Sequence, residues 1–229
     1  MVTDRFDRAS WEARWARAQG KRRPPSAHLV QTASDLTPGL ALDAGAGNGT
    51  ETLWLAERGW QVDALDFAAT ALQDGAEAAA KRGLADRVTW LQADLSVWSP
   101  APARYDLVAC LYVHVVGSAQ DLVRRLAGGV IPGGTLLLVG HHPAPGQVQV
   151  SVSDAAAVLE GWKFVVAEER PHASGSGMDA LVRAIRPAEA AHPSKSTAAS
   201  RGMKLSLERL CPGSGLRSRD WDRGLLGER

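Results

Sequence analysis

The sequence has little cysteine, no long apolar run and no excess of charge of one sign. Cys110 and Cys211 are its only cysteines among 229 residues, and they lie far apart in the chain. Cys110 falls within an apolar run, so we expect a buried thiol there. Sparse cysteines of this kind are typical of a reducing compartment, and we expect a cytoplasmic location.

The positive and negative charges balance almost completely. Lysine and arginine number 26 against 25 aspartates and glutamates, which gives a net charge of +1. Such a balance provides no global field to attract nucleic acid or an anionic membrane surface. No stretch approaches the roughly 20 apolar residues that span a bilayer, and the polar opening MVTDRFDRAS is unlike a secretory signal. We therefore expect neither a nucleic-acid partner nor a membrane partner.

The composition and length indicate one globular domain with appended segments. Hydrophobic residues make up 45% and charged residues 22% of the chain, as in ordinary soluble proteins. Residues 1–39 hold two short helical patterns, at 10–19 and 27–36, and we expect them to form an N-terminal helical cap segment. Residues 188–229 are rich in Pro, Ser, Gly and Arg, which favours a disordered tail.

Short apolar runs alternate with helix-like stretches between residues 40 and 187. LALDA, QVDALD, VTWLQAD, YDLVACLYV and GTLLLVG recur at the spacing of strands in βα units. WKFVVAEERP and MDALVRAIRP then follow each other across a short link, which suits a hairpin. The sequence thus predicts an α/β fold with a doubly wound, mostly parallel, seven-stranded Rossmann-like sheet. We expect an antiparallel terminal strand and helices on both faces.

Residues 42–49, LDAGAGNG, end the first predicted strand in an acid followed by three alternate glycines. Glycines at a strand-to-helix turn let the backbone approach a ligand closely. The spacing is GxGxG and not the GxGxxG of dinucleotide sites, and Asp43 would repel a pyrophosphate at that point. An acid in this place favours a ligand with a cationic portion.

Two further acids follow the next two predicted strands. Asp66 ends the run QVDALD, and Asp94 lies in LQADLSVW. Because the carboxyl ends of parallel strands meet at one edge of a sheet, Asp43, Asp66 and Asp94 would lie along one crevice. A carboxylate at the tip of the second strand can accept hydrogen bonds from both ribose hydroxyls. Each acid alone could instead cap a helix or a turn.

The acid, the GxGxG loop and the two later strand-end acids resemble the class I S-adenosylmethionine-dependent methyltransferase family. The resemblance extends from about Leu40 to Pro187. The segments SWEARW and WLAERGWQVDALD are similar, more weakly, to the thiopurine and tellurite-resistance branch of that family. The resemblance implies S-adenosyl-L-methionine as the cofactor and S-adenosyl-L-homocysteine as the product.

The same resemblance implies roles for individual residues. Asp43 would hold the cofactor's ammonium group, Asp66 its ribose and Asp94 its adenine amine. Ala46 stands where the family more often has cysteine. The other cofactor-binding residues that it implies are Gly45, Ala46, Gly47 and Gly49 in the loop wall, Phe67 against the adenine, and Leu95 through its backbone N–H.

Candidates for the acceptor side follow the fourth and fifth predicted strands. Tyr112 and His114 lie in LYVHV, and His141 and His142 lie in GHHP. His114 or His141 could act as a catalytic base, because histidine titrates near neutrality, or could simply pack in a loop. No metal is expected, because the histidine pair has no carboxylate or cysteine partner at ligand spacing.

Trp11 and Trp15 lie four residues apart on one face of the first helical pattern. They could form an apolar lid over the acceptor, or they could only dock this helix on the domain. Both readings place the N-terminal segment against the folded domain.

Three functions remain open on the sequence. The first is a methyltransferase with a small-molecule acceptor, because the short segment between His142 and Asp154 leaves little material for a large substrate domain. The second is a non-catalytic scaffold or sensor that binds the cofactor. The third is a dinucleotide-dependent oxidoreductase in which Asp66 holds the adenosine ribose, and the GxGxG spacing disfavours it.

Overall fold

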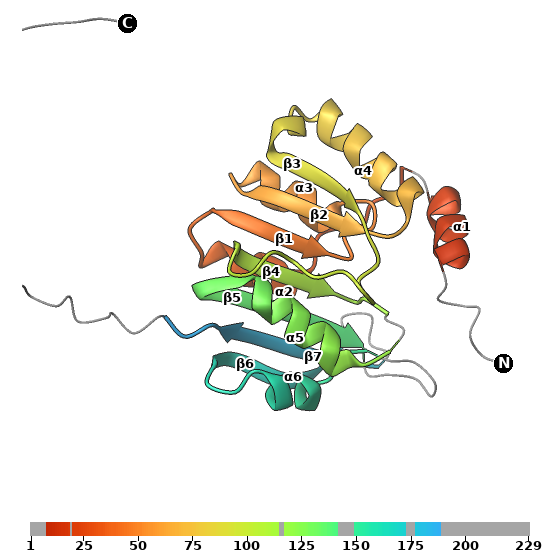
Figure 1. The fold of residues 1–229 in the computed structure, drawn as a ribbon. Helices are drawn as coiled ribbons and strands as arrows, with labels where there is room; N and C mark the ends of the chain where they lie inside the picture. The colour runs from red at the N-terminus through yellow and green to blue at the C-terminus, as the bar shows by residue number, and fades with distance from the viewer. Residues whose placement is uncertain (1–7, 19, 115–116, 142–148, 173–176, 189–229) are drawn as a thin grey trace, which may run out of the picture. The chain divides into compact units, whose positions relative to one another are not determined.

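The computed structural model describes residues 8–18, 20–114, 117–141, 149–172 and 177–188. They form a seven-stranded sheet flanked by helices (Figure 1). The elements in chain order are α1 (Arg8–Ala18), α2 (Ala27–Ser34), β1 (Leu40–Ala44), α3 (Thr50–Glu57), β2 (Gln61–Asp66), α4 (Ala69–Lys81), η1 (Ala85–Arg87), β3 (Val88–Gln92), β4 (Tyr105–Leu111), α5 (Ala119–Gly129), β5 (Val130–His141), α6 (Val152–Val158), β6 (Lys163–Pro171) and β7 (Met178–Ile185).

The sheet has the strand order β3-β2-β1-β4-β5-β7-β6. β1 pairs in parallel with β2 on one side and with β4 on the other. The chain therefore builds outward from β1 in one direction and then in the other. The reversal between β1 and β4 leaves a crevice at the carboxyl ends of these strands, where ligands bind in open α/β sheets.

The last two strands confirm the predicted hairpin. β7 inserts between β5 and β6 and runs antiparallel to both. The predicted fold class, a mostly parallel seven-stranded sheet that ends in antiparallel strands, is confirmed. The pairing places His141 opposite Asp179 in neighbouring strands, which matters for the site.

Alternate residues of the central strands face two separate apolar cores. On one face Leu42 packs with the buried residues of α5, such as Leu122. On the other face Ala41 packs with Leu29 of α2 and Leu55 of α3. Figure 1 shows α5 and α6 on one side of the sheet and α2 and α3 on the other. The helices therefore cover both faces, as the apolar strand patterns predict.

Several boundaries differ slightly from the sequence predictions. The helical patterns at 10–19 and 27–36 form α1 and α2, which end at Ala18 and Ser34. β3 ends at Gln92, so that Asp94 lies in the loop beyond the strand. The predicted tail falls outside the described residues except for Ala188. Within the described part of the chain, no helix is long and apolar enough to cross a membrane.

Candidate cofactor and acceptor site

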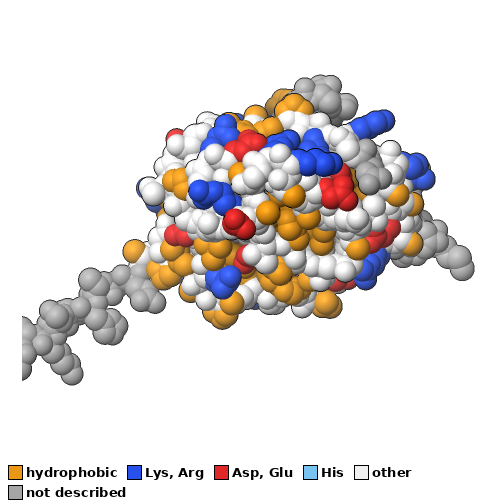
Figure 2. Space-filling model, turned by 90° about the horizontal axis from the view of Figure 1, so that it is seen from above, with side chains coloured by type: hydrophobic (Ala, Val, Ile, Leu, Met, Phe, Trp, Pro, Cys, Tyr) orange, Lys and Arg blue, Asp and Glu red, His pale blue; other side chains and the backbone are white. Residues whose placement is uncertain are grey.

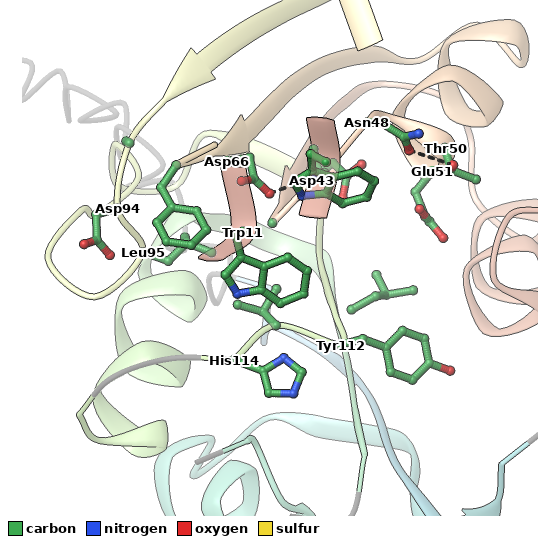
Figure 3. Close-up of a pocket in the computed structure, with 18 of the residues that line it drawn as sticks. Trp11, Asp43, Asn48, Thr50, Glu51, Asp66, Asp94, Leu95, Tyr112 and His114 are labelled. Carbon is green, nitrogen blue, oxygen red and sulfur yellow. Dashed lines mark hydrogen bonds between the residues drawn. The ribbon is translucent and has the colours of Figure 1, made fainter. Parts of the chain in front are cut away.

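A cavity of about 1010 Å³ lies at the carboxyl ends of the central strands, with residues of α1 in its wall (Figure 3). The structure brings nearly all of the predicted site residues to this cavity. Those that line it are Trp11, Trp15, Asp43, Gly45, Ala46, Gly47, Asp66, Phe67, Asp94, Leu95, Tyr112, His114 and His141. Gly49 belongs to the same loop but is not part of the wall, and His142 lies outside the described residues.

Backbone hydrogen bonds anchor the glycine loop to the neighbouring strand. The N–H groups of Gly45 and Ala46 both donate to the carbonyl oxygen of Leu65, over 2.7 and 2.9 Å. The loop then enters α3 through Gly49, the residue before the helix, with a left-handed φ of 78°. These bonds hold the loop backbone at the mouth of the β1–β2 crevice.

Neighbouring aromatic side chains leave no room for a Cβ atom at two of the loop glycines, Gly47 and Gly49. Gly47 has a φ of 54°, and a Cβ built on it would lie 2.6 Å from the Trp15 ring. A Cβ on Gly49 would lie 2.5 Å from the ring of Trp90. Both the backbone conformation and the space therefore require glycine at these two positions.

Asp43 is a buried carboxylate at the centre of the site. Its side chain accepts a hydrogen bond from Thr52 Oγ1 at 2.6 Å, and the residue is 3% exposed. Burial and the negative charge of Glu51 raise the pKa of Asp43 to about 7, although the hydrogen bond from Thr52 opposes the shift. A positively charged group placed beside Asp43 would remove this cost, so the site favours a cation.

Glu51 is a second buried acid in the cavity wall, and sequence reasoning missed it. It is 6% exposed, and its carboxylate accepts a hydrogen bond from the backbone N–H of Ser26. The sequence TETLWLAERG indicates only a helix here. The signal was its place in the first turn after the glycine loop, where side chains lie near the strand ends.

Asp66 caps the start of α4, as the sequence allowed, and also lines the cavity. Its Oδ2 accepts a hydrogen bond from the N–H of Gly47, and its Oδ1 accepts one from the N–H of Ala68, both over 2.9 Å. The carboxylate thus fixes the loop and the start of α4 while it lines the cavity. Burial raises the pKa of Asp66, although these backbone hydrogen bonds oppose the shift.

Asp94, Leu95 and Phe67 form the far end of the cavity wall. Asp94 is exposed, and its Oδ1 accepts a hydrogen bond from the N–H of Ser96 at 2.8 Å, which is the turn-capping contact that the sequence allowed. Leu95 is buried and Phe67 is half-buried. Figure 3 shows Asp94 and Leu95 side by side, apart from Asp43.

The two tryptophans of α1 reach different parts of the site. The ring of Trp11 lies 6.1 Å from that of His114, measured between centroids. Trp15 instead lies against Gly47 of the glycine loop. The two indole rings stack on each other with centroids 6.4 Å apart. Trp15 thus lies against the predicted cofactor loop, and Trp11 lies near His114.

Hydrogen bonds that Glu12 accepts hold α1 in this position. Its two carboxylate oxygens accept the backbone N–H groups of Ala69 and Thr70 at 2.7 and 3.1 Å. These donors lie at the start of α4, where backbone N–H groups have no partner within the helix. Glu12 therefore couples α1 to the start of α4, close to Asp66.

A basic segment between α1 and α2 also contacts the loop, and sequence reasoning missed these contacts. Arg22 donates to the carbonyl oxygen of Asp74 at 2.7 Å and forms an ion pair with its carboxylate at 3.2 Å. The Asn48 side-chain amide donates to the carbonyl oxygen of Lys21 at 3.0 Å. Lys21, Arg22 and Arg23 all line the cavity, so the basic segment supplies positive charge at its wall.

His114 and Tyr112 lie at the end of β4. Gln149 Nε2 lies 2.7 Å from His114 Nε2. Burial lowers the pKa of His114, and the nearby His141 and Arg14 act in the same direction. Tyr112 has a left-handed φ of 57°, which is uncommon for a residue other than glycine. Such conformations often occur at functional sites.

His141 has a carboxylate partner that the sequence analysis did not find. Its Nδ1 lies 3.0 Å from Oδ1 of Asp179 on β7, and His172 Nδ1 lies 3.0 Å from the same carboxylate. Tyr112 donates its hydroxyl to Asp179 Oδ2 at 3.0 Å. The reason for expecting no metal, the absence of a carboxylate near His141, is therefore wrong. Strand pairing brings Asp179 to His141 across a long sequence separation.

Comparison with known proteins agrees with the fold. Residues 41–134 match the family described as Methyltransferase domain. Among solved structures, the chain is similar to magnesium protoporphyrin IX methyltransferase from Synechocystis with bound S-adenosylmethionine. That likeness has a TM-score of 0.60 at 20% identity and covers 81% of this chain and 95% of the other. At this identity the likeness shows the fold.

Two curated relatives share part of the sequence. Ribosomal RNA small subunit methyltransferase C of Alcanivorax borkumensis is 34% identical over 47% of this chain, which spans only 34% of that protein. Thiocyanate methyltransferase 1 of Arabidopsis thaliana is 28% identical over 73% of this chain and 79% of its own length. The two relatives are named for different methyl acceptors.

Proposed function

The chain belongs to the class I S-adenosylmethionine-dependent methyltransferase family, and on this premise we propose that it methylates a small-molecule acceptor. The observation that carries the proposal is the convergence of Asp43, Asp66 and Asp94 with the glycine loop on one cavity. S-adenosyl-L-methionine, when bound, supplies a methyl group on a positively charged sulfur that a nucleophile can attack in line.

The residues of the cavity fit this cofactor. A buried Asp43 with a raised pKa suits an ammonium group, because a cation favours the ionised carboxylate. The glycine loop presents backbone where a Cβ would collide with its neighbours. We assign Asp66 to the ribose hydroxyls and Asp94 to the adenine amine, with Phe67 and Leu95 as apolar walls.

Residues 1–39 act in this proposal as a cap on the domain of residues 40–187. Trp15 covers the glycine loop, and Trp11 lies near His114 at the acceptor end. Methyl transfer disperses charge and needs mainly alignment and the exclusion of water. An aromatic cap of this kind serves both needs, which supports the lid function of α1.

We assign proton removal, for an acceptor that carries a proton, to His114. Burial lowers its pKa, so its imidazole stays neutral and able to accept a proton at neutral pH. The contact between Gln149 and His114 Nε2 would give way to the acceptor. His141 remains the other candidate for this role, and its contact with Asp179 is taken up in the next subsection.

The charge of the surface and of the cavity wall favours a small acceptor over a nucleic acid. Figure 2 shows acidic and basic side chains interspersed over the face it presents, in keeping with the net charge of +1. Such a surface gives a nucleic acid little electrostatic hold. Lys21 and Arg23 in the cavity wall suit an anion, and one relative that is similar over 73% of this chain and 79% of its own length is named for thiocyanate. Thiocyanate is therefore the first acceptor to test.

Calorimetry tests the cofactor assignment directly. Titration with S-adenosyl-L-homocysteine should show one site, and Asp66→Ala combined with Asp94→Ala should weaken it at least about 100-fold, since each hydrogen bond to a charged group contributes roughly 1.5–3 kcal/mol. Asp86→Ala is the matched control, because Asp86 is exposed and lies outside the cavity wall. Undiminished binding by the double variant would remove the basis of the assignment.

Label transfer tests the catalysis. Methyl-labelled S-adenosyl-L-methionine is incubated with thiocyanate, small thiols and small carboxylic acids, and labelled products are separated. Label in a small product supports the proposal. Cofactor binding without transfer to any acceptor in a broad panel favours the alternative, a non-catalytic scaffold or sensor, and binding of NADH in place of the sulfonium compound would favour an oxidoreductase.

A further inference from the structure

Three imidazoles and a tyrosine surround one buried carboxylate beside the cavity. Asp179 is 1% exposed. Its Oδ1 lies 3.0 Å from the Nδ1 atoms of both His141 and His172. Its Oδ2 lies 3.0 Å from the Tyr112 hydroxyl and 3.9 Å from His28 Nε2. Three of the six histidines in the sequence thus converge on this carboxylate.

The fold brings these residues together from different elements. His141 and Asp179 are directly paired residues of the antiparallel strands β5 and β7. His172 follows the last residue of β6, and its N–H donates to the carbonyl oxygen of Gly177 across the hairpin. His28 comes from α2, which packs on β5 through the apolar core that contains Leu29. The cluster is therefore held by the sheet and by a helix.

The geometry suits a single ion. One ligand atom each from His141, His172 and Asp179 can be chosen so that all three lie within 4.8 Å of one another. Two imidazole nitrogens and a carboxylate oxygen are ligands that zinc and neighbouring divalent metals bind, whereas magnesium and calcium prefer oxygen alone. Three protein ligands also leave a coordination position for water or substrate.

The charges of the cluster suit one cation. His141 Nδ1 lies 3.0 Å from Oδ1 of Asp179, and His172 Nδ1 lies 3.0 Å from both oxygens of that carboxylate. The two imidazole ring centroids lie 4.8 Å apart. A divalent cation uses both Nδ1 lone pairs and neutralises the buried carboxylate.

We propose that His141, His172 and Asp179 bind one first-row transition-metal dication of the zinc type at the acceptor end of the cavity. His141 belongs to the cavity wall, so the ion would lie at its border. An open coordination position there would bind an anionic or sulfur-containing acceptor group. None of the three residues is assigned to the cofactor, so the site stands apart from the cofactor proposal.

The test is zinc calorimetry on the full chain, purified without an affinity tag and freed of metal with a chelator. The wild type should bind about one Zn²⁺ per chain, confirmed by elemental analysis after dialysis. Asp179→Asn and His172→Ala should each lower the affinity at least about 10-fold. His114→Ala is the matched control, because it removes a cavity histidine outside the three ligands and should retain zinc binding.

Cobalt substitution adds a spectroscopic test of the coordination. Co²⁺ bound to the wild type should give the visible absorption bands of a low-coordinate site, and Asp179→Asn should abolish these bands. Melting curves verify that each variant is folded. If Asp179→Asn does not fold, His172→Ala takes its place as the ligand variant. Zinc binding that is absent, or that is the same in the wild type and both ligand variants, would overturn the proposal.

A separate titration distinguishes the two proposals. S-adenosyl-L-homocysteine is added to the metal-free protein, where it should bind as in the zinc-loaded protein. If zinc fails to bind but the cofactor product binds, the metal site is wrong and the methyltransferase proposal stands. If the product fails to bind and zinc binds, the methyltransferase proposal is wrong and the metal site stands.

Discussion

At the scale of the residue, Asp43 links stability to ligand binding. Its pKa is about 7 in the folded chain against an ordinary value of 3.8. Because the folded value is the higher one, the contribution of this group to stability is full below about pH 4 and is lost as the pH rises through 7. The fold is thus destabilised at neutral pH by the carboxylate that we propose binds the ammonium group of the cofactor.

Asp43→Asn should therefore stabilise the empty protein, because it removes the buried charge and keeps an oxygen for Thr52. We expect its melting temperature to exceed that of the wild type by more at pH 8 than at pH 5. Thermal unfolding at the two pH values measures this difference. An advantage that is the same at both pH values would show that Asp43 does not titrate in this range.

The same substitution should weaken cofactor binding. In the wild type, affinity for S-adenosyl-L-methionine should rise between pH 5.5 and 7.5 as Asp43 ionises. Asp43→Asn should bind more weakly and show a flatter dependence. Calorimetry across this range gives both quantities, and equal slopes for the two proteins would place the ammonium group elsewhere.

Gly47→Ala tests the glycine loop. An alanine there requires a left-handed φ, which costs roughly 1–2 kcal/mol, and its Cβ would collide with Trp15. We expect the affinity for S-adenosyl-L-homocysteine to fall about 10-fold or more. Gly83→Ala is the matched control, because Gly83 also has a positive φ but open space around it. Equal affinity in both variants would mean that the collision has no effect on the site.

A pH profile tests His114. If it accepts the acceptor's proton, the acidic limb of kcat/KM should lie below the ordinary histidine value of 6.5, because burial lowers its pKa. The positive charges that act on it come from His141 on β5 and Arg14 on α1. His114→Gln should remove the limb. A limb that persists in this variant would exclude His114 as the base.

At the scale of the element, α1 depends on Glu12. Glu12→Ala should release this helix from the start of α4, at a cost of roughly 0.5–2 kcal/mol, as for other capping contacts. We expect a higher KM for the acceptor and a smaller loss of affinity for S-adenosyl-L-homocysteine, because Trp11 and Trp15 would no longer be held over the cavity. Glu77→Ala on α4 is the control, since the Glu77 carboxylate accepts a hydrogen bond from Gln73 of the same helix. Unchanged KM in Glu12→Ala would count against the lid.

The sequence predicts elements well where their apolar pattern repeats. The alternation of strands and helices gives the sheet and its final hairpin, because burial on both faces requires continuous apolar strands. It predicts ends less well. β3 ends at Gln92, two residues before Asp94, because its pairing with β2 stops there. The pairing partner that ends a strand is not visible in the strand's own residues.

At the scale of the whole molecule, ligand binding should raise stability. S-adenosyl-L-homocysteine at about 100 times its Kd should add roughly 2.7 kcal/mol, which for a chain of this length raises the melting temperature by about 5–10 °C. NADH at the same concentration should cause no shift. Thermal scans measure both, and a shift with NADH alone would point to a dinucleotide site.

One part of the candidate site could not be predicted, because its residues lie far apart in the sequence. Asp43 and Asp66 follow a local motif, so the sequence predicts them. Asp179 lies 38 residues from His141 and contacts it through the pairing of β5 and β7. His141 is a candidate from the sequence, but Asp179 has no neighbouring signal of a ligand site. Their encounter depends on strand register, which a single sequence does not specify where the flanking residues tolerate a shift.

The antiparallel pairing of β7 has one more consequence. Side chains directly opposite each other in a ladder point to the same face of the sheet, and His141 and Asp179 are such a pair. A slip of one residue along β5 would turn Asp179 away from both imidazoles. The histidine cluster therefore forms only when the C-terminal hairpin closes in its native alignment, and the function proposed for it depends on the register of two strands far from the glycine loop in sequence.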